Sequence, residues 1–218
     1  MKKIFGFTNK KEIYQKCLYA SVAHAVMVGK YDLLLDEIAW DEKNYLFQDM
    51  EGLRAVIAFG ENLFMCGVQN RESKPEQKEK LIDMYFGGNE RENVQYAEDE
   101  IFPYFLEEIE NEDGISISAL FWGDDTVILS KMDEKDIIKI SGGILLPYLY
   151  NFSDLKKYWR DYYEASDEQF ELIENVYQER LTKGQFDLKE KQKEKLKLWY
   201  GDNINFCRQA FREIGITV

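Results

Sequence analysis

The stretch LRAVIAFGENLFMCGV, residues 53–68, decides the fold class that we predict for this chain. It contains two runs rich in branched and aromatic residues, 53–59 and 63–68, and such runs are typical of β-strands. The residues Gly60-Glu61-Asn62 separate the two runs, and a short loop with a glycine is typical of a hairpin. We therefore predict two antiparallel strands here.

A second hairpin is predicted within residues 115–130. Apolar and polar residues alternate along 116–121, and this period of two residues indicates a strand. The run 126–130 is a second strand, and the polar turn 122–125 joins the two. Residues 137–140 are a candidate for one more strand.

Helices are predicted on both sides of these strands. Asn9 and Glu12 form a capping-box pattern, and we expect the helix that follows them to cover residues 10–28. In the last third of the chain, Ser153 and Ser166 are predicted N-caps of two helices, with further helices after them. The pattern predicts an α+β fold: a mostly antiparallel central sheet flanked by helices, with a helical C-terminal third.

The domain organisation follows from the length of the chain and from the lack of a linker. The 218 residues contain no internal repeat, no low-complexity tract and no Pro/Gly/Ser-rich segment. A chain of this length can bury roughly 70–75% of the surface that its unfolded form exposes. We expect a single domain over 1–218, and we leave open whether 153–218 forms a helical subdomain.

Acidic residues are concentrated in one segment. The chain carries 28 Lys and Arg against 41 Asp and Glu, which gives a formal net charge of −13. Residues 92–130 contain eleven acidic residues and neither Lys nor Arg, so this segment alone contributes −11. We predict that a helix begins near Asp99 and directs four apolar side chains to the core: Phe102, Phe105, Leu106 and Ile109.

We predict that the carboxylates of this segment bind a positively charged partner. Charges on one face lie within the Debye length of about 8 Å at physiological salt, so they repel one another until a cationic surface covers them. A solubilising surface without a partner is the alternative. The candidate contact residues are Glu98, Asp99, Glu100, Glu107, Glu108, Glu110, Asp124 and Asp125.

Aromatic side chains supply a second candidate surface. Leu155, Tyr158, Trp159 and Tyr162 share one face of the helix predicted after Ser153. Core packing explains most of these aromatic residues, but tyrosine and tryptophan also anchor interfaces, because they bury a large area and keep a polar tip. We add Tyr158, Trp159 and Tyr162 to the candidate partner contacts.

No catalytic motif is present. The sequence lacks the GxSxG, GxxxxGK[ST] and GxGxxG patterns of hydrolases, P-loops and dinucleotide-binding folds. His24, the only histidine, lies on the apolar side of the first predicted helix and is expected in the core. Cys17, Cys66 and Cys207 have no metal-binding spacing and are expected to be reduced and buried. We predict no catalytic residue, no metal ligand and no cofactor.

Charge and hydropathy restrict the partners. The acidity disfavours direct contact with nucleic acid, which requires a basic face. The first apolar residues are too few for a signal peptide, and no run approaches the roughly 20 residues of a membrane-spanning helix. We expect a cytoplasmic protein without membrane contact.

Our leading hypothesis is an acidic protein-binding module, of the immunity or inhibitor type, that neutralises a basic protein such as a toxic nuclease. Electrostatic steering accelerates such an association, and carboxylates can take the places of phosphates. Two alternatives stay open. One is a hydrolase that uses paired carboxylates or a divalent metal ion. The other is a structural homo-oligomer that associates through the tyrosine-rich helix.

Overall fold

The computed structural model describes residues 1–6, 8–87, 90–109, 112–149 and 151–218. These residues form two compact units, and each unit combines two segments that are distant in the sequence. Unit 1 consists of Met1–Ile13 and Glu42–Leu149, and unit 2 of Tyr14–Asp41 and Tyr150–Val218. The predicted subdomain 153–218 falls within unit 2.

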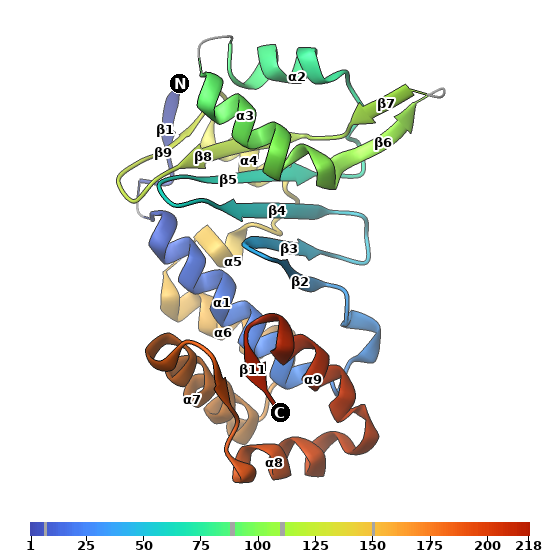
Figure 1. Ribbon diagram of the computed structural model, residues 1–218, viewed down its shortest axis with the longest axis vertical. Helices are drawn as coiled ribbons and strands as arrows, with labels where there is room; N and C mark the ends of the chain where they lie inside the picture. Colours follow the sequence, from blue (N-terminus) through green and yellow to red (C-terminus); the bar gives the residue numbers. More distant parts are fainter. Residues whose placement is uncertain (7, 88–89, 110–111, 150) are drawn as a thin grey trace. The chain divides into compact units, whose positions relative to one another are not determined.

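The chain has a seven-stranded antiparallel sheet in the order β1-β9-β8-β5-β4-β3-β2 (Figure 1). Its strands are β1 (Lys2–Ile4), β2 (Ile38–Asp41), β3 (Asn44–Gln48), β4 (Arg54–Phe59), β5 (Phe64–Gln69), β8 (Ala119–Gly123) and β9 (Ile128–Ser130). A separate antiparallel hairpin consists of β6 (Leu106–Ile109) and β7 (Glu112–Ile115). The α+β class, the antiparallel sheet and the helical C-terminal region are thus confirmed.

The helical elements follow the same order along the chain. The first is α1 (Lys10–Met27), and the boundary between the two units falls inside it. Unit 1 also contains α2 (Lys78–Tyr85), α3 (Arg91–Glu100), the 3₁₀ turn η2 (Phe102–Phe105), α4 (Glu134–Ile140) and α5 (Leu146–Leu149). Unit 2 contains η1 (Asp32–Leu34), α6 (Phe152–Tyr162), α7 (Asp167–Lys183), α8 (Glu190–Tyr200), η3 (Gly201–Asn203) and α9 (Ile204–Glu213), with the short parallel pair β10 (Phe186–Asp187) and β11 (Ile216–Thr217).

Both predicted hairpins form. β4 and β5 pair from Arg54 opposite Gln69 to Phe59 opposite Phe64. β8 and β9 form the second hairpin, but β8 begins only at Ala119. All five residues of β8 are buried, so the alternation expected along 116–121 does not separate an inner face from an outer one.

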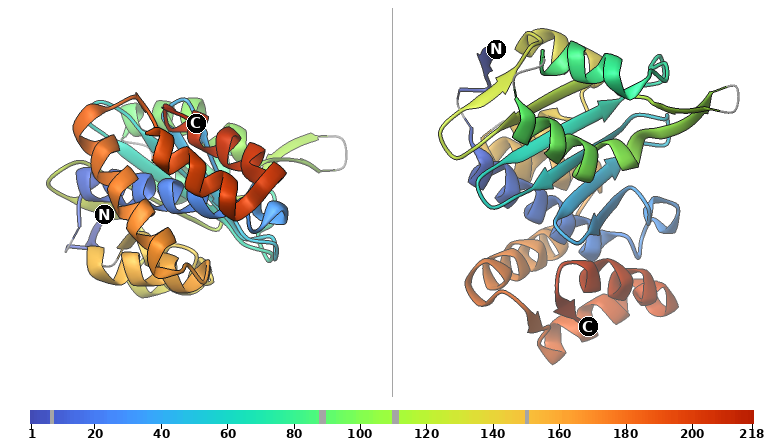
Figure 2. Two further views of the ribbon diagram at one scale, coloured as in Figure 1. Left: turned by 90° about the horizontal axis from the view of Figure 1, so that it is seen from below. Right: turned by 45° about the horizontal axis from the view of Figure 1, so that its top comes forward.

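Helices α2 and α3 and the turn η2 cover one face of the sheet (Figures 1 and 2). Their apolar side chains pack on Val56, Met65 and Trp122 of the central strands. The layers approach closely at Gly67, where an added Cβ would lie 2.7 Å from Cε2 of Phe105. A glycine in the middle of this strand is therefore explained by the ring that lies against it.

The opposite face carries a cluster of aromatic rings. Tyr148 of α5 contacts Phe47 with 4.6 Å between ring centroids, and its hydroxyl lies 2.7 Å from the hydroxyl of Tyr45. Phe5 meets Phe121 edge to face at 5.5 Å. Unit 1 therefore has an apolar layer on each side of its central strands, as strands buried on both faces require.

The prediction that a helix begins near Asp99 is wrong. α3 begins at Arg91 and ends at Glu100, and the chain then passes through η2 into β6. Pro103 lacks the N–H that would continue an α-helix, so the chain tightens into a 3₁₀ turn. Leu106, with φ −67° and ψ 132°, is already extended.

Four apolar side chains were predicted to point from that helix into the core, and the structure bears this out only in part. Phe102 and Phe105 are buried, as predicted. Leu106 is 54% exposed, so its placement in the core is wrong. The side chain of Ile109 lies outside the described part of the structure.

Residues 137–140 lie in α4 and not in a strand, which is a second correction. Glu134 in the first turn and Lys139 in the last turn complement the helix dipole, and Ile137 supplies a buried contact. A short apolar run does not by itself distinguish a strand from a helix.

The helix caps were predicted with mixed success. Asn9 accepts a hydrogen bond from the backbone N–H of Glu12 at 2.9 Å, as predicted. Ser166 caps α7 in a capping box, also as predicted. Ser153 is not the N-cap of α6, because Asn151 occupies that position and accepts from the N–H of Asp154.

In unit 2, His24 of α1 is buried, as predicted, with 1% of its surface exposed. Its Nδ1 lies 2.9 Å from the hydroxyl of Tyr163, and its Nε2 lies 3.3 Å from the carbonyl oxygen of Leu35. Burial lowers the pKa of His24 from 6.5 to about 4, because the charged imidazolium is poorly solvated there. The three cysteines are likewise buried and not in disulfides.

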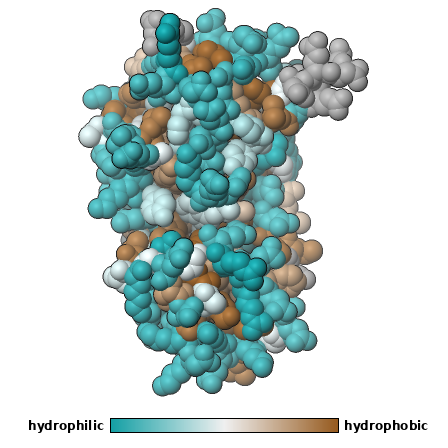
Figure 3. All heavy atoms as spheres, in the orientation of Figure 1, coloured by the Kyte–Doolittle hydropathy of each residue, from teal (hydrophilic) through white to brown (hydrophobic). Residues whose placement is uncertain are grey.

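The face in Figure 3 is covered mostly by hydrophilic side chains, with apolar atoms in separate patches. Among the residues that the structure describes, no helix combines the length and the apolar character needed to cross a bilayer.

The burial of His24 predicts a pH-dependent stability. The unfolded chain binds a proton at His24 near pH 6.5, whereas the folded chain binds it only near pH 4. The free energy of unfolding should therefore fall as the pH drops through this window, by up to about 3 kcal/mol from this residue. Denaturant titrations of the wild type and of His24→Gln measure the difference, and the variant should show the flatter pH dependence. Parallel pH profiles would show that His24 is not the responsible group.

Candidate functional site

The predicted acidic residues of α3 have partners within the chain. The Glu98 carboxylate lies 2.9 Å from Nζ of Lys78, and the Glu100 carboxylate lies 2.6 Å from Nζ of Lys43. Asp99 accepts a hydrogen bond from the side-chain amide of Gln95 at 3.0 Å. The charge of Glu98 and of Glu100 is thus offset by a lysine distant in the sequence.

Asp124 and Asp125 hold a turn together. Oδ1 of Asp124 accepts hydrogen bonds from the N–H and the hydroxyl of Thr126, both at 2.6 Å, and these bonds lower the pKa of Asp124. Oδ1 of Asp125 accepts from the N–H of Lys11 at 3.0 Å, in the first turn of α1. Both residues therefore have a structural role in unit 1.

Two of the remaining predicted acidic residues, Glu107 and Glu108, belong to strand β6 of the β6–β7 hairpin. Glu108 is in direct register with Asp113, and Glu107 is in register with Gly114. The two strands extend past the ends of the central strands of the sheet (Figures 1 and 2). Glu110 lies outside the described residues. The predicted acidic set is thus spread over α3, this hairpin and the β8–β9 turn.

The predicted aromatic residues divide between surface and core. Tyr158 and Tyr162 of α6 are 42% and 41% exposed, and their rings stack at 5.9 Å. Trp159 is buried behind them. With Asp154, Lys157 and Asp161, the two tyrosines line a shallow pocket of about 460 Å³ in unit 2.

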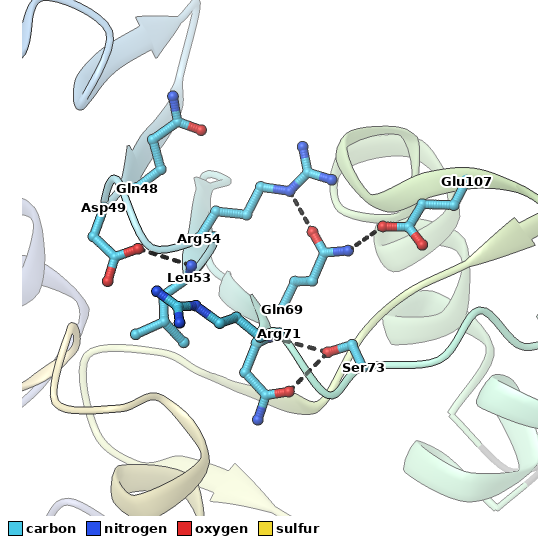
Figure 4. Close-up of a pocket in the computed structure, with 10 residues that line it drawn as sticks. Gln48, Asp49, Leu53, Arg54, Gln69, Arg71, Ser73 and Glu107 are labelled. Carbon is cyan, nitrogen blue, oxygen red and sulfur yellow. Dashed lines mark hydrogen bonds between the residues drawn. The ribbon is translucent and has the colours of Figure 1, made fainter. Parts of the chain in front are cut away.

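A polar cleft of about 500 Å³, which was not predicted from the sequence, lies at one end of the sheet in unit 1 (Figure 4). Three neighbouring strands end or begin at this cleft: β3 ends at Gln48, β4 begins at Arg54 and β5 ends at Gln69. The strand register places these three residues in one row. The full lining is Gln48, Asp49, Gly52, Leu53, Arg54, Gln69, Asn70, Arg71, Ser73 and Glu107.

A hydrogen-bonded chain crosses this cleft. Nε of Arg54 donates to the side-chain oxygen of Gln69, and the side-chain amide of Gln69 donates to the carboxylate of Glu107, as Figure 4 shows. Gln69 is only 7% exposed, so its amide is held in one orientation by these two bonds. The guanidinium of Arg54 also lies over the ring of Phe105, 5.8 Å from its centroid.

The turn between β3 and β4 forms one wall of the cleft. Oδ1 of Asp49 accepts from the N–H groups of Glu51 at 2.8 Å and Leu53 at 2.9 Å, and Gly52 has a positive φ of 89°. The guanidinium of Arg71 forms an ion pair of 3.0 Å with Glu51. The turn therefore fixes the carboxylate of Asp49 at the cleft and places the carboxylate of Glu51 against Arg71.

Asn70 connects the floor of the cleft to the loop before β8. Its Oδ1 accepts from the hydroxyl of Ser118 at 3.0 Å and from that of Ser73 at 3.3 Å. Its side-chain amide donates to the carbonyl oxygen of Ile140 at 3.2 Å, which joins the loop to α4. The polar groups around the cleft are thus held by a network that spans several elements.

Among the described residues, no group of three or more His, Cys, Asp or Glu side chains is placed to hold a metal ion. The chain matches no protein-family model, and searches of curated proteins and of solved structures find no similar protein.

The bridging role of Gln69 is testable. In Gln69→Leu, the side chains of Arg54 and Glu107 lose their common partner in a partly buried site, and we expect the free energy of unfolding to fall by about 1–3 kcal/mol. The exposed Gln95→Leu is the matched control and should change it by less than about 0.5 kcal/mol. Urea denaturation measures both, and equal effects of the two substitutions would contradict the bridge.

Proposed function

We propose that this protein is an acidic, cytoplasmic protein-binding module and that its β6–β7 hairpin contacts a basic partner. The observation that carries the proposal is the hairpin register, in which Glu108 of β6 pairs with Asp113 of β7. The surrounding segment 92–130 supplies no Lys or Arg that could offset these charges from within. The register therefore places acidic residues of the two strands opposite one another.

Electrostatics supports a cationic partner. Like charges directly opposite one another in a β-ladder are destabilising, so a surface of Lys and Arg that covers the hairpin gains both direct attraction and relief of this repulsion. A concentrated negative potential also accelerates encounter with a positive surface. We regard these effects as the reason for the hairpin's composition.

The proposed contact surface is narrower than the acidic set predicted from sequence. Glu98 and Glu100 already have lysine partners, whereas Asp124 and Asp125 accept backbone hydrogen bonds that hold the β8–β9 turn and the start of α1. The proposal therefore rests on the hairpin strands.

More specifically, we propose that the protein is an immunity or inhibitor protein that neutralises a toxic nuclease. Nucleases carry basic surfaces because they bind phosphates, and a ribbon of carboxylates can occupy the same positions. A partner of this kind combines strong attraction with direct blockage of the substrate site.

The triple variant Glu108→Gln/Glu112→Gln/Asp113→Asn tests the hairpin. Affinity capture from native lysate, at about 50 mM and about 200 mM salt, should recover a basic protein with the wild type. Recovery should fall with salt, and it should fall at least about tenfold with the triple variant.

The control carries the same change of charge on unit 2: Glu190→Gln/Glu194→Gln/Asp202→Asn, on α8 and η3. It should capture the partner as the wild type does. Capture of the same protein by the hairpin variant, or binding that does not respond to salt, would refute the proposal.

A second candidate function, a homo-oligomer, is favoured by the exposed tyrosines of α6. Tyr158 and Tyr162 present two stacked rings to solvent, and aromatic residues with a polar tip are enriched at protein interfaces. A self-complementary contact through this helix would give a symmetric dimer.

Sedimentation velocity tests this second candidate. The wild type should form a dimer as its concentration rises, and Tyr158→Ser/Tyr162→Ser should stay monomeric. Leu198→Ser removes an exposed apolar residue from α8 and should leave the association unchanged. A wild type that is monomeric at every concentration would rule out the oligomer.

A further inference from the structure

Arg54 presents an unused edge of its guanidinium to the polar cleft. Its Nε is occupied by Gln69, and its plane lies over Phe105, so the direction of the group is set. Among the side chains that the structure describes, no carboxylate forms an ion pair with Arg54. The two terminal nitrogens are therefore left for a bidentate contact with an anion, the geometry in which arginine binds carboxylates most strongly.

Carboxylates face the same cleft. Asp49 uses Oδ1 for two backbone N–H groups, and Glu107 uses Oε1 for Gln69. In the described part of the chain, the second oxygen of each has no hydrogen-bond partner. These oxygens can accept from an ammonium group of a ligand.

The balance of charge restricts the ligand. Arg54, Arg71, Asp49 and Glu107 line the cleft, and Glu51 forms an ion pair with Arg71. Two arginines and three carboxylates give this set a net charge of −1. A dianionic phosphate is therefore disfavoured, whereas a ligand with one carboxylate and two cationic groups is matched in both sign and number.

We propose that this cleft binds a free basic amino acid. Its carboxylate is held by the terminal nitrogens of Arg54, and its cationic groups face Glu107 and Asp49. The cleft volume of about 500 Å³ is within the range of small-molecule sites, and polar side chains around it are held by internal hydrogen bonds. The inference goes beyond the proposed function; the cleft shares Glu107 with strand β6 but contains none of the residues changed in the hairpin variant.

Isothermal titration calorimetry of the whole protein tests this site with four probes: L-lysine, the tripeptide Gly-Gly-Lys, L-lysine amide and inorganic phosphate. We expect L-lysine to bind with a Kd of about 1 mM or tighter, and more tightly than the tripeptide, because the lysine at the end of the tripeptide has no α-ammonium group. L-lysine amide, which lacks the carboxylate, should bind at least about tenfold more weakly than L-lysine.

Two variants locate the binding. Arg54→Gln should weaken binding of L-lysine at least about tenfold, and Arg91→Gln, the same change on the exposed start of α3, should leave it within about twofold. A thermal melt establishes that Arg54→Gln is folded. If it is not, Glu107→Gln is the second variant, with weakened binding again expected.

Several results would overturn the inference. These are no binding of L-lysine to the wild type, binding of its amide or of the tripeptide that is as tight as that of L-lysine, and tighter binding of phosphate than of lysine. Unchanged binding by a folded Arg54→Gln variant would also overturn it. If that variant does not fold, unchanged binding by the Glu107→Gln variant would do so. The hairpin variants leave Arg54 in place, so the cleft and the partner surface fail or succeed separately.

Discussion

The register between β4 and β5 is the constraint on which the rest of unit 1 depends. Both strands are buried on both faces apart from the partly buried Arg54, so each residue has a fixed layer to pack against. A slip of one residue would turn every side chain to the other face and would direct Arg54 into the aromatic layer. The same register brings Gly67 beneath Phe105 and sets Arg54 opposite Gln69.

The position of the acidic hairpin follows from that packing. Phe105 is buried against Gly67, so the chain is fixed to the sheet at the end of η2 and β6 starts at the next residue. Glu107, two residues after Phe105, then reaches Gln69. One residue therefore belongs to both features that we connect with binding, the hairpin and the cleft, and both depend on the contact between a ring and a glycine.

Local signals in the sequence were sufficient for the main elements of the fold. The loop at Gly60 and the branched residues on each side of it specify the β4–β5 hairpin, and the caps at Asn9 and Ser166 specify two helix starts. Strands β2 and β3 were not predicted. The apolar residues from Phe102 to Ile109 have the spacing of a helix, but the missing N–H of Pro103 and the packing of Phe105 select a turn and a strand.

The candidate sites were less predictable, because they depend on contacts between distant segments. The acidic segment was evident from composition, but the pairing of Glu98 with Lys78 and of Glu100 with Lys43 requires the tertiary structure. The cleft gave no local signal, because its polar residues come from several separate segments. The polar residues at the ends of neighbouring strands, such as Arg54, were the one feature of the sequence that could have indicated the cleft.

The most direct test of this account is a double-mutant cycle between Arg54 and Glu107, measured as free energies of unfolding with Arg54→Gln and Glu107→Gln. Both groups bind the same buried amide, so we predict that the two substitutions are coupled by about 0.5–3 kcal/mol. Effects that add within about 0.3 kcal/mol would show that the register does not join these residues through Gln69, and the account of the cleft would be wrong.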